Sequence, residues 1–220
     1  MMISTTRTMT TTSTTMRIES LLPPSQPGKP WTLTLEGGKT LRTPEGLVID
    51  FALYQGKDLE EEVLAQLEEA AFGAGLREKA VSLLTGRMMS AGQLREKLLA
   101  KGGTEAQVQD ILDWVERIGL LNDEEYAKAL VRHYQAKGYG IYKIKDELYR
   151  RQVPKDLWEE ALAGLEEPDD SIRRFLEKKL TDPQDRKQVK KVSDALIRRG
   201  FTWGQVSRGI ESFRRDCDDI

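Results

Sequence analysis

The sequence is poor in the residues that most often carry chemistry. Its 220 residues include one cysteine, Cys217, and one histidine, His133. A single cysteine cannot form an internal disulfide, and a single histidine excludes a metal or catalytic site built on several histidines. Aromatic residues make up only 7% of the chain, which favours helices that each bury one apolar stripe. We therefore expect no cofactor, no bound metal and no enzymatic activity.

Long apolar runs are also missing. No run approaches the ~20 residues that a helix needs to cross a bilayer, and residues 1–17 lack the apolar middle of a secretory signal. One unpaired cysteine is typical of a reducing compartment. These absences predict a cytoplasmic protein without membrane association.

Residues 1–30 are rich in threonine and then in proline, and such a segment cannot bury enough apolar surface to order itself. We expect a disordered tail there. The product of an upstream start codon is a second interpretation, and a transit peptide ranks below both.

Charge is unevenly spread, although the net charge is only −2. Residues 1–75 contain 6 basic and 10 acidic side chains, whereas residues 171–215 contain 13 basic and 5 acidic ones. A basic segment in a mildly acidic protein indicates an anionic partner. On charge alone, a solvated helix surface explains it equally well.

Residues 31–75 show two kinds of pattern. Residues 31–43 read WTLTL-EGGK-TLRT, an alternation around Gly37-Gly38 that predicts a β-hairpin. The apolar run Leu47–Leu53 is expected to add a strand. Residues 58–72 are acidic at their start and predict a helix capped by Asp58. We therefore expect a small sheet that packs against this helix.

From residue 76 onward one helical pattern occurs three times. Its apolar stripe repeats at intervals of 50 and 48 residues, as Leu94 and Leu98, Ile144 and Leu148, and Val192 and Leu196. A basic residue follows three positions after the second of each pair: Lys101, Arg151 and Arg199. The next residue is Gly102, Gln152 or Gly200, and glycine is typical of a helix C-cap. Helix-start residues then stand at Thr104, Pro154 and Thr202.

Each copy also has a helix in front of this pair, so the chain contains three tandem three-helix units. We call them repeat 1 (residues 76–120), repeat 2 (121–168) and repeat 3 (169–216). Tandem helical units stack on their neighbours and expose one long surface. We therefore predict a mainly α protein whose repeats form an elongated, curved array behind a small N-terminal sheet.

Two stretches carry a family resemblance. Residues 79–102 read KAVSLLTGRMMSAGQLREKLLAKG and contain Arg87, Ser90, Leu98, Lys101 and Gly102. Residues 119–148 read GLLNDEEYAKALVRHYQAKGYGIYKIKDEL and contain Leu121, Asn122, Asp123, Tyr126 and Ala127. With these motifs the chain resembles the RecX family over roughly residues 30–215. One departure is the turn Arg151-Gln152-Val153, which lacks the usual glycine.

The resemblance implies a helical-repeat regulator that binds the filament of the RecA recombinase. Such a protein would lie in the groove of the filament and modulate, in our leading interpretation inhibit, ATP hydrolysis, strand exchange and coprotease activity. It would act in recombination and the SOS response, and it would also contact single- or double-stranded DNA weakly and without sequence preference. We expect a monomer.

The basic residues that suit such contacts lie mostly on the second helix of each repeat. Lys143 and Arg150 are seven residues apart, as are Lys191 and Arg198, so each pair shares one helix face. The predicted contact residues are Lys143, Lys145, Arg150, Arg151, Lys187, Lys190, Lys191, Arg198, Arg199 and Arg208. Tyr139 and Tyr142 lie beside the first pair, where packing between repeats is favoured over stacking on bases.

A helix-turn-helix transcriptional regulator is the main alternative function. It would place the third helix of a repeat in the major groove, yet the third helices of repeats 1 and 2 are acidic and would be repelled by phosphates. Only the third helix of repeat 3, through Arg208, is basic enough to enter the major groove.

A nuclease ranks last because no carboxylates converge on a metal. Trp114, Trp158 and Trp203 are expected to pack in the core.

Overall fold

The computed structural model describes residues 15–165 and 167–218. The chain divides into an N-terminal unit that ends at Lys79 and a helical unit that begins at Ala80. Within the described residues the fold is mainly α-helical with one small antiparallel sheet, which confirms the predicted fold class.

The N-terminal unit is built on a four-stranded sheet of order β3-β2-β1-β4. Its strands are β1 (Thr15–Leu22), β2 (Trp31–Leu35), β3 (Thr40–Thr43) and β4 (Asp58–Glu60). The predicted hairpin is present as β2 and β3, with Leu33 opposite Leu41. Gly37 and Gly38 connect them with φ angles of 86° and 82°, a backbone region that glycine adopts without steric cost. The turn chemistry thus fixes the register of this hairpin.

The expectation of disorder up to residue 30 is wrong for residues 15–22. Residues 15–22 form β1, the strand that pairs with both β2 and β4. Its apolar positions Met16 and Ile18 pack on the core of the sheet, where Ile18 is fully buried. A few well-placed apolar residues outweigh the polar composition, because neighbouring strands satisfy the backbone on both sides. Residues 1–14 of the predicted tail lie outside the described residues.

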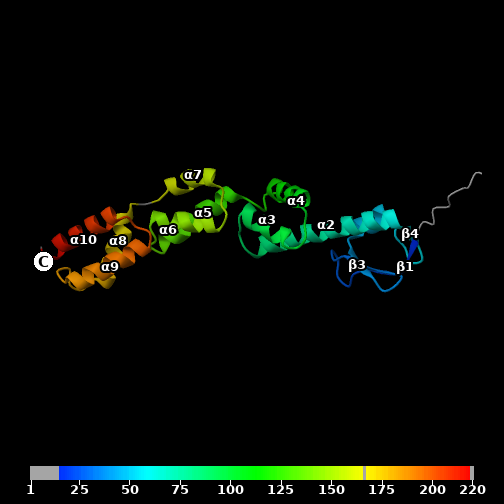
Figure 1. Cartoon of the computed structure of the whole chain (residues 1–220), viewed down its shortest axis with the longest axis horizontal. Coiled ribbons are helices and arrows are strands. Elements are labelled where there is room, and N and C mark those ends of the chain that lie inside the picture. The colour runs from blue at the N-terminus through cyan, green and yellow to red at the C-terminus, as the bar shows by residue number, and fades with distance from the viewer. Residues whose placement is uncertain (1–14, 166, 219–220) are drawn as a thin grey trace, which may run out of the picture. The chain divides into compact units, whose positions relative to one another are not determined.

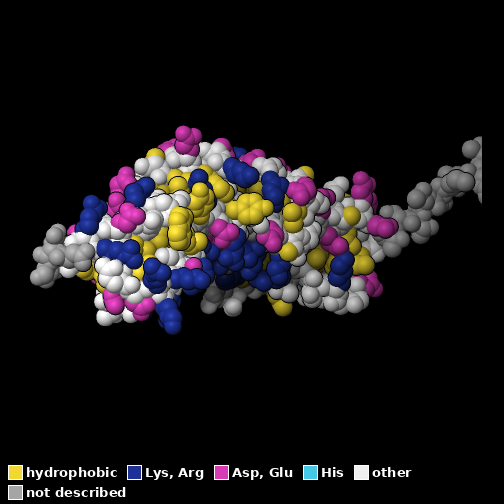
Figure 2. Space-filling model, turned by 60° about the vertical axis from the view of Figure 1, so that its left-hand side comes forward, with side chains coloured by type: hydrophobic (Ala, Val, Ile, Leu, Met, Phe, Trp, Pro, Cys, Tyr) yellow, Lys and Arg dark blue, Asp and Glu magenta, His cyan; other side chains and the backbone are white. Residues whose placement is uncertain are grey.

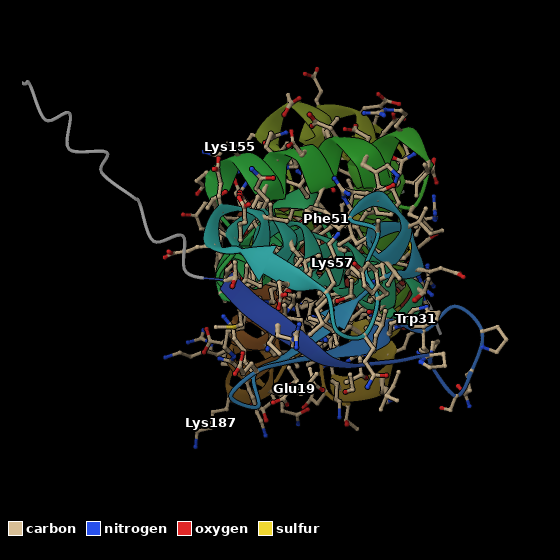
Figure 3. All side chains as sticks on the ribbon, turned by 90° about the vertical axis from the view of Figure 1, so that its right-hand side faces the viewer. Glu19, Trp31, Phe51, Lys57, Lys155 and Lys187 are labelled. Carbon is tan, nitrogen blue, oxygen red and sulfur yellow. The ribbon has the colours of Figure 1, made fainter. Side chains whose placement is uncertain are left out.

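The segment that follows the hairpin is a helix, not the expected third strand. Helix α1 (Glu45–Asp50) starts after Pro44, and its residues Leu47 and Val48, with the C-cap residue Phe51, pack on the sheet core at helical spacing. Lys57 caps the C-terminal end of α1, because its Nζ donates to the carbonyl oxygen of Phe51 at 2.6 Å (Figure 3).

One continuous helix, α2 (Glu61–Gly86), replaces both the helix predicted over residues 58–72 and the separate first helix expected in repeat 1. Residues 58–60 pair with β1 instead, with Leu59 buried, so the helix begins three residues later than predicted. Gly73 and Gly75 do not interrupt α2, since an interior glycine costs a helix only about 1 kcal/mol.

The helical unit contains the three predicted repeats (Figure 1). Repeat 1 joins the end of α2 to α3 (Ala91–Leu99) and α4 (Glu105–Arg117). Repeat 2 consists of α5 (Asp123–Ala136), α6 (Ile141–Arg150), the 3-10 turn η1 (Lys155–Leu157) and α7 (Trp158–Ala163). Repeat 3 consists of α8 (Pro168–Lys179), α9 (Arg186–Arg198) and α10 (Trp203–Asp218). Repeats 2 and 3 each enclose a buried apolar core of their own.

Side-chain caps, including those predicted at Thr104 and Thr202, explain where four of these helices begin. Thr104 with Gln107 and Thr202 with Gln205 exchange reciprocal hydrogen bonds, and Ser90 and Asn122 each accept a backbone N–H three residues ahead. The turn after the middle helix also repeats. Gly102 and Gly200 have φ angles of 91° and 89°, and Gln152 adopts 55° at the equivalent place. The left-handed turn is therefore kept in repeat 2 despite the missing glycine.

Candidate partner-binding surface on the middle helices

The second helix of repeat 2 begins where the second helix of repeat 3 ends. The N–H of Gly140 donates to the carbonyl oxygen of Arg199 at 2.8 Å, and the N–H of Tyr142 donates to that of Gly200 at 3.2 Å. A Cβ on Gly140 would lie 2.3 Å from the oxygen of Gly200. Free donors at the start of α6 thus meet free acceptors at the end of α9.

The same joint recurs between repeats 1 and 2. The Ser90 hydroxyl at the start of α3 donates to the carbonyl oxygen of Arg151 at the end of α6. Gly92 has no room for a side chain, because a Cβ there would lie 2.7 Å from the Cβ of Gln152. The helices α9, α6 and α3 therefore follow one another end to start (Figure 1). We call this arrangement the row of middle helices.

Residues of the second family motif (residues 119–148) hold the joint between repeats 1 and 2. Asn122 caps its own helix, while the Asp123 carboxylate accepts the N–H of Ala91 at 2.8 Å. Burial raises the pKa of Asp123, and the hydrogen bond from Ala91 opposes that shift. Tyr126 is buried, and its hydroxyl accepts from Nη1 of Arg151 at 3.1 Å. The motif therefore positions the surface and does not itself form a reactive site.

Three of the predicted contact residues in repeat 2 surround one acid, Glu147. Its carboxylate lies 3.0 Å from Nζ of Lys143, 3.3 Å from Nη1 of Arg150 and 3.7 Å from Nε of Arg151. Lys143 also pairs with the exposed Asp146 at 3.0 Å. Burial raises the pKa of Glu147, but hydrogen bonds from Lys143 and Tyr134 and the adjacent positive charges outweigh it and lower the pKa overall. All three cations thus already have an anionic neighbour within repeat 2.

The cations of repeat 3 are arranged differently. Lys187, Lys190, Lys191 and Arg198 are all exposed on α9, and none forms an ion pair within 4.0 Å with another described residue. Lys187 projects away from the ribbon (Figure 3). Their side chains remain available to an external anion.

Arg199 is a structural residue in this geometry. Its Nη1 donates to the carbonyl oxygens of Lys137 and Gly138 at 3.1 and 3.2 Å. Its guanidinium also lies over the rings of Tyr139 and Phe175, 5.2 and 4.8 Å from their centroids. Arg199 thus connects repeat 3 to repeat 2.

The two remaining predicted contacts lie apart from these groups. Lys145 is half-buried on α6, and Arg208 is exposed on α10. Neither forms an ion pair with a described residue. Both can therefore reach an external anion.

Aromatic side chains border the row of middle helices. Tyr139 packs against Tyr134 of its own repeat and lies under the guanidinium of Arg199 from repeat 3, so it packs between repeats as expected. Tyr142 is 60% exposed and Trp203 is 66% exposed, so the expectation of packing is wrong for these two. Figure 2 shows Lys and Arg side chains gathered on one face, next to exposed hydrophobic side chains. The surface therefore combines positive charge with accessible rings.

Sequence reasoning missed the role of Glu147. The signal was present, because Glu147 stands four residues after Lys143, three before Arg150 and four before Arg151. Those spacings place charges side by side on a helix. Exposure of Trp203 had no comparable signal, since a tryptophan at a helix start is equally compatible with packing.

Fold and surface together define a tandem helical-repeat protein with a basic row of middle helices. Among the described residues, no cluster of metal-binding side chains occurs and no helix is long and apolar enough to span a membrane. Comparisons with known proteins agree with this class. Residues 77–114 match the first three-helix domain of RecX, and residues 122–162 match the second.

Two relatives named regulatory protein RecX are about one-third identical to this chain over the aligned residues. The Vibrio parahaemolyticus protein is 32% identical over 139 residues, which cover 61% of this chain and 88% of the relative. The Trichlorobacter lovleyi protein is 33% identical over 130 residues, covering 56% and 84%. The chain belongs to the RecX family of regulatory proteins.

Two solved structures support the fold. A crystal structure of a regulatory protein RecX superimposes with a TM-score of 0.65 at 21% identity, covering 90% of this chain and 99% of the other. RecX from Lactobacillus salivarius gives a TM-score of 0.60 at 20% identity, covering 65% and 97%. The relatives are named as regulatory proteins and not as enzymes.

Proposed function

We propose that this protein binds the filament of the RecA recombinase and inhibits its ATPase, strand-exchange and coprotease activities. In this proposal the protein acts in the cytoplasm as a monomer. It also contacts the phosphate backbone of DNA weakly and without sequence preference. Family membership supports the partner, since modulation of RecA is what the resemblance to RecX implies.

The observation that carries the proposal is the row of middle helices. Its end-to-start joints place α9, α6 and α3 in succession, and a repeated arrangement of helices suits a partner that itself repeats. The exposed cations of α9 add attraction for phosphates or for acidic groups along such a partner.

The helix-turn-helix alternative fits the third helices less well. Helix α7 is only six residues long, and α4 carries Glu105, Asp110, Asp113 and Glu116. Sequence-selective binding of duplex DNA that depends on Arg208 would favour this alternative over the proposal.

The decisive experiment measures ATP hydrolysis by RecA on single-stranded DNA while this protein is added in substoichiometric amounts. We expect the rate to fall, because one molecule lying along the filament contacts several RecA subunits. An unchanged rate, together with unchanged filament stability, would refute the proposal.

A charge-reversal variant tests which surface is used. Replacing Lys187, Lys190, Lys191 and Arg198 by glutamate should weaken both RecA inhibition and DNA binding by at least about tenfold at low salt, because several contacts to anions are lost. Arg42→Glu is the control for a charge reversal outside the row of middle helices, because Arg42 is exposed on β3 and forms no ion pair with a described residue. Full inhibition by the quadruple variant would place the contact elsewhere.

A further inference from the structure

Repeats 2 and 3 carry the same set of three cations on their middle helices. Lys143 and Arg150 of α6, with its C-cap residue Arg151, correspond to Lys191 and Arg198 of α9, with its C-cap residue Arg199, each displaced by 48 residues. The residue that lies between these cations in the sequence differs between the two repeats. It is Glu147 in repeat 2 and Ala195 in repeat 3. The chain thus contains one pattern with an internal acid and one without.

In repeat 2 the acid is fixed in place. Glu147 is 9% exposed, and its carboxylate is within 4 Å of all three cations of that set. An external phosphate would have to compete with this carboxylate for Lys143 and Arg150. A carboxylate held by the fold competes strongly, because it loses no freedom when it pairs.

In repeat 3 nothing replaces that carboxylate. Ala195 has no charge, and Lys191 and Arg198 are exposed without an ion pair to a described residue. Asp194 is the nearest acid along α9, and it too forms no ion pair within 4.0 Å with a described residue. Arg199 is held by backbone carbonyls, so Lys191 and Arg198 are the free members of this set.

We propose that Glu147 is an internal counter-ion that withholds the cations of repeat 2 from a nucleic-acid backbone, whereas Ala195 leaves those of repeat 3 available. This inference rests on the DNA contact in the proposed function and specifies which repeat makes it. The exposed ring of Trp203, four residues after Arg199, favours a single strand, because unpaired bases can stack on it.

The test is binding of a fluorescent single-stranded oligodeoxythymidylate, measured by anisotropy over a series of salt concentrations. Glu147→Gln should bind ~3–10-fold more tightly near 0.1 M salt. Its affinity should also fall more steeply with salt, by about 0.7 in the logarithmic slope for each additional phosphate that the variant neutralises. Ala195→Glu should weaken binding by a similar factor, because it supplies repeat 3 with the acid that repeat 2 has.

Glu159→Gln is the matched control. It removes the same unit of negative charge from repeat 2, at an exposed position without an ion pair to a described residue. We expect it to change affinity less than about twofold, as a distant surface charge is screened. Equal effects of Glu147→Gln and Glu159→Gln would overturn the inference.

Folding of each variant is checked by circular dichroism and thermal unfolding. If Glu147→Gln does not fold, Ala195→Glu decides alone, and unchanged affinity of that variant overturns the inference. Failure of the wild type and of folded Glu147→Gln to bind the oligonucleotide also overturns it.

The RecA assay is independent of this result, so inhibition of RecA without oligonucleotide binding would leave the main proposal standing. Binding of an acidic polypeptide but not the oligonucleotide would likewise overturn it and assign the surface to a protein.

Discussion

Gln152 is the residue at which repeat 2 departs from its neighbours. It adopts a φ of 55° where repeats 1 and 3 have glycine, and a left-handed conformation costs a non-glycine residue roughly 1–2 kcal/mol. Its side chain offsets part of that cost, because Nε2 donates to Oε2 of Glu96 at 2.8 Å. Gln152 thus adopts a strained backbone conformation and forms a hydrogen bond between repeats 1 and 2.

Two substitutions separate these effects. Gln152→Gly removes the strain and the hydrogen bond, whereas Gln152→Ala removes the hydrogen bond and keeps the strain. We expect the glycine variant to be more stable than the alanine variant by about 1 kcal/mol in denaturant unfolding. Equal stability would mean that this turn is not strained.

Glu147 also predicts how stability depends on pH. Its folded pKa is lowered, so the carboxylate stabilises the native state above the unfolded pKa of about 4.3. That contribution is lost as the pH falls through the lower, folded value. We expect the stability difference between wild type and Glu147→Gln to shrink between pH 6 and pH 3, measured by urea unfolding. A difference that does not vary with pH would show that Glu147 acts through packing alone.

Among the elements, the joints between middle helices leave no room for an added side chain. Gly140 has ordinary extended backbone, with φ −81° and ψ 169°, so alanine is conformationally allowed there. Its Cβ would nevertheless lie within 2.7 Å of three backbone atoms of residues 200 and 201. The joint therefore requires glycine because of space and not because of φ.

The corresponding prediction compares two glycines. Gly140→Ala should destabilise the protein by about 1–3 kcal/mol through overpacking against backbone. Gly204→Ala is the control, since Gly204 lies in α10 with nothing within 4 Å of an added Cβ. It should be neutral or stabilising by up to about 1 kcal/mol. Thermal unfolding of both variants checks the prediction, which fails if their midpoints shift alike.

Element prediction from sequence succeeded where local chemistry decides. The caps at Thr104 and Thr202, and the glycine turn of the hairpin, all depend on contacts within a few residues. It failed where distant partners decide. Strand β1 is stabilised by pairing with β2 and β4, and residues 58–60 join β1 although they read as a helix start.

The candidate site was predictable to a similar extent. The sequence located the cations on the middle helices, because periodicity assigns residues to a face. It did not separate free cations from paired ones, such as Lys191 from Lys143. Nor did it identify Arg199 as a link between repeats, since its acceptors are carbonyls some 60 residues away.

At the scale of the whole molecule, the predicted contact residues all belong to the helical unit. The cores of repeats 2 and 3 are formed entirely by residues of that unit. We therefore expect a fragment of residues 61–220, which begins at α2, to unfold cooperatively and to bind the oligonucleotide within about twofold of the full chain. Circular dichroism and anisotropy measure both properties. A fragment that folds but loses binding would assign a contact to the sheet.

The joints between middle helices have an electrical consequence. Each helix carries a dipole that is positive at its start and negative at its end. The start of α6 lies against the end of α9, and the start of α3 lies against the end of α6. The three dipoles therefore point the same way along the row. The row has a polarity, positive where α9 begins and negative where α3 ends. A polymer with unlike ends, such as a DNA strand or a protein filament, would differ in energy between its two orientations on this surface.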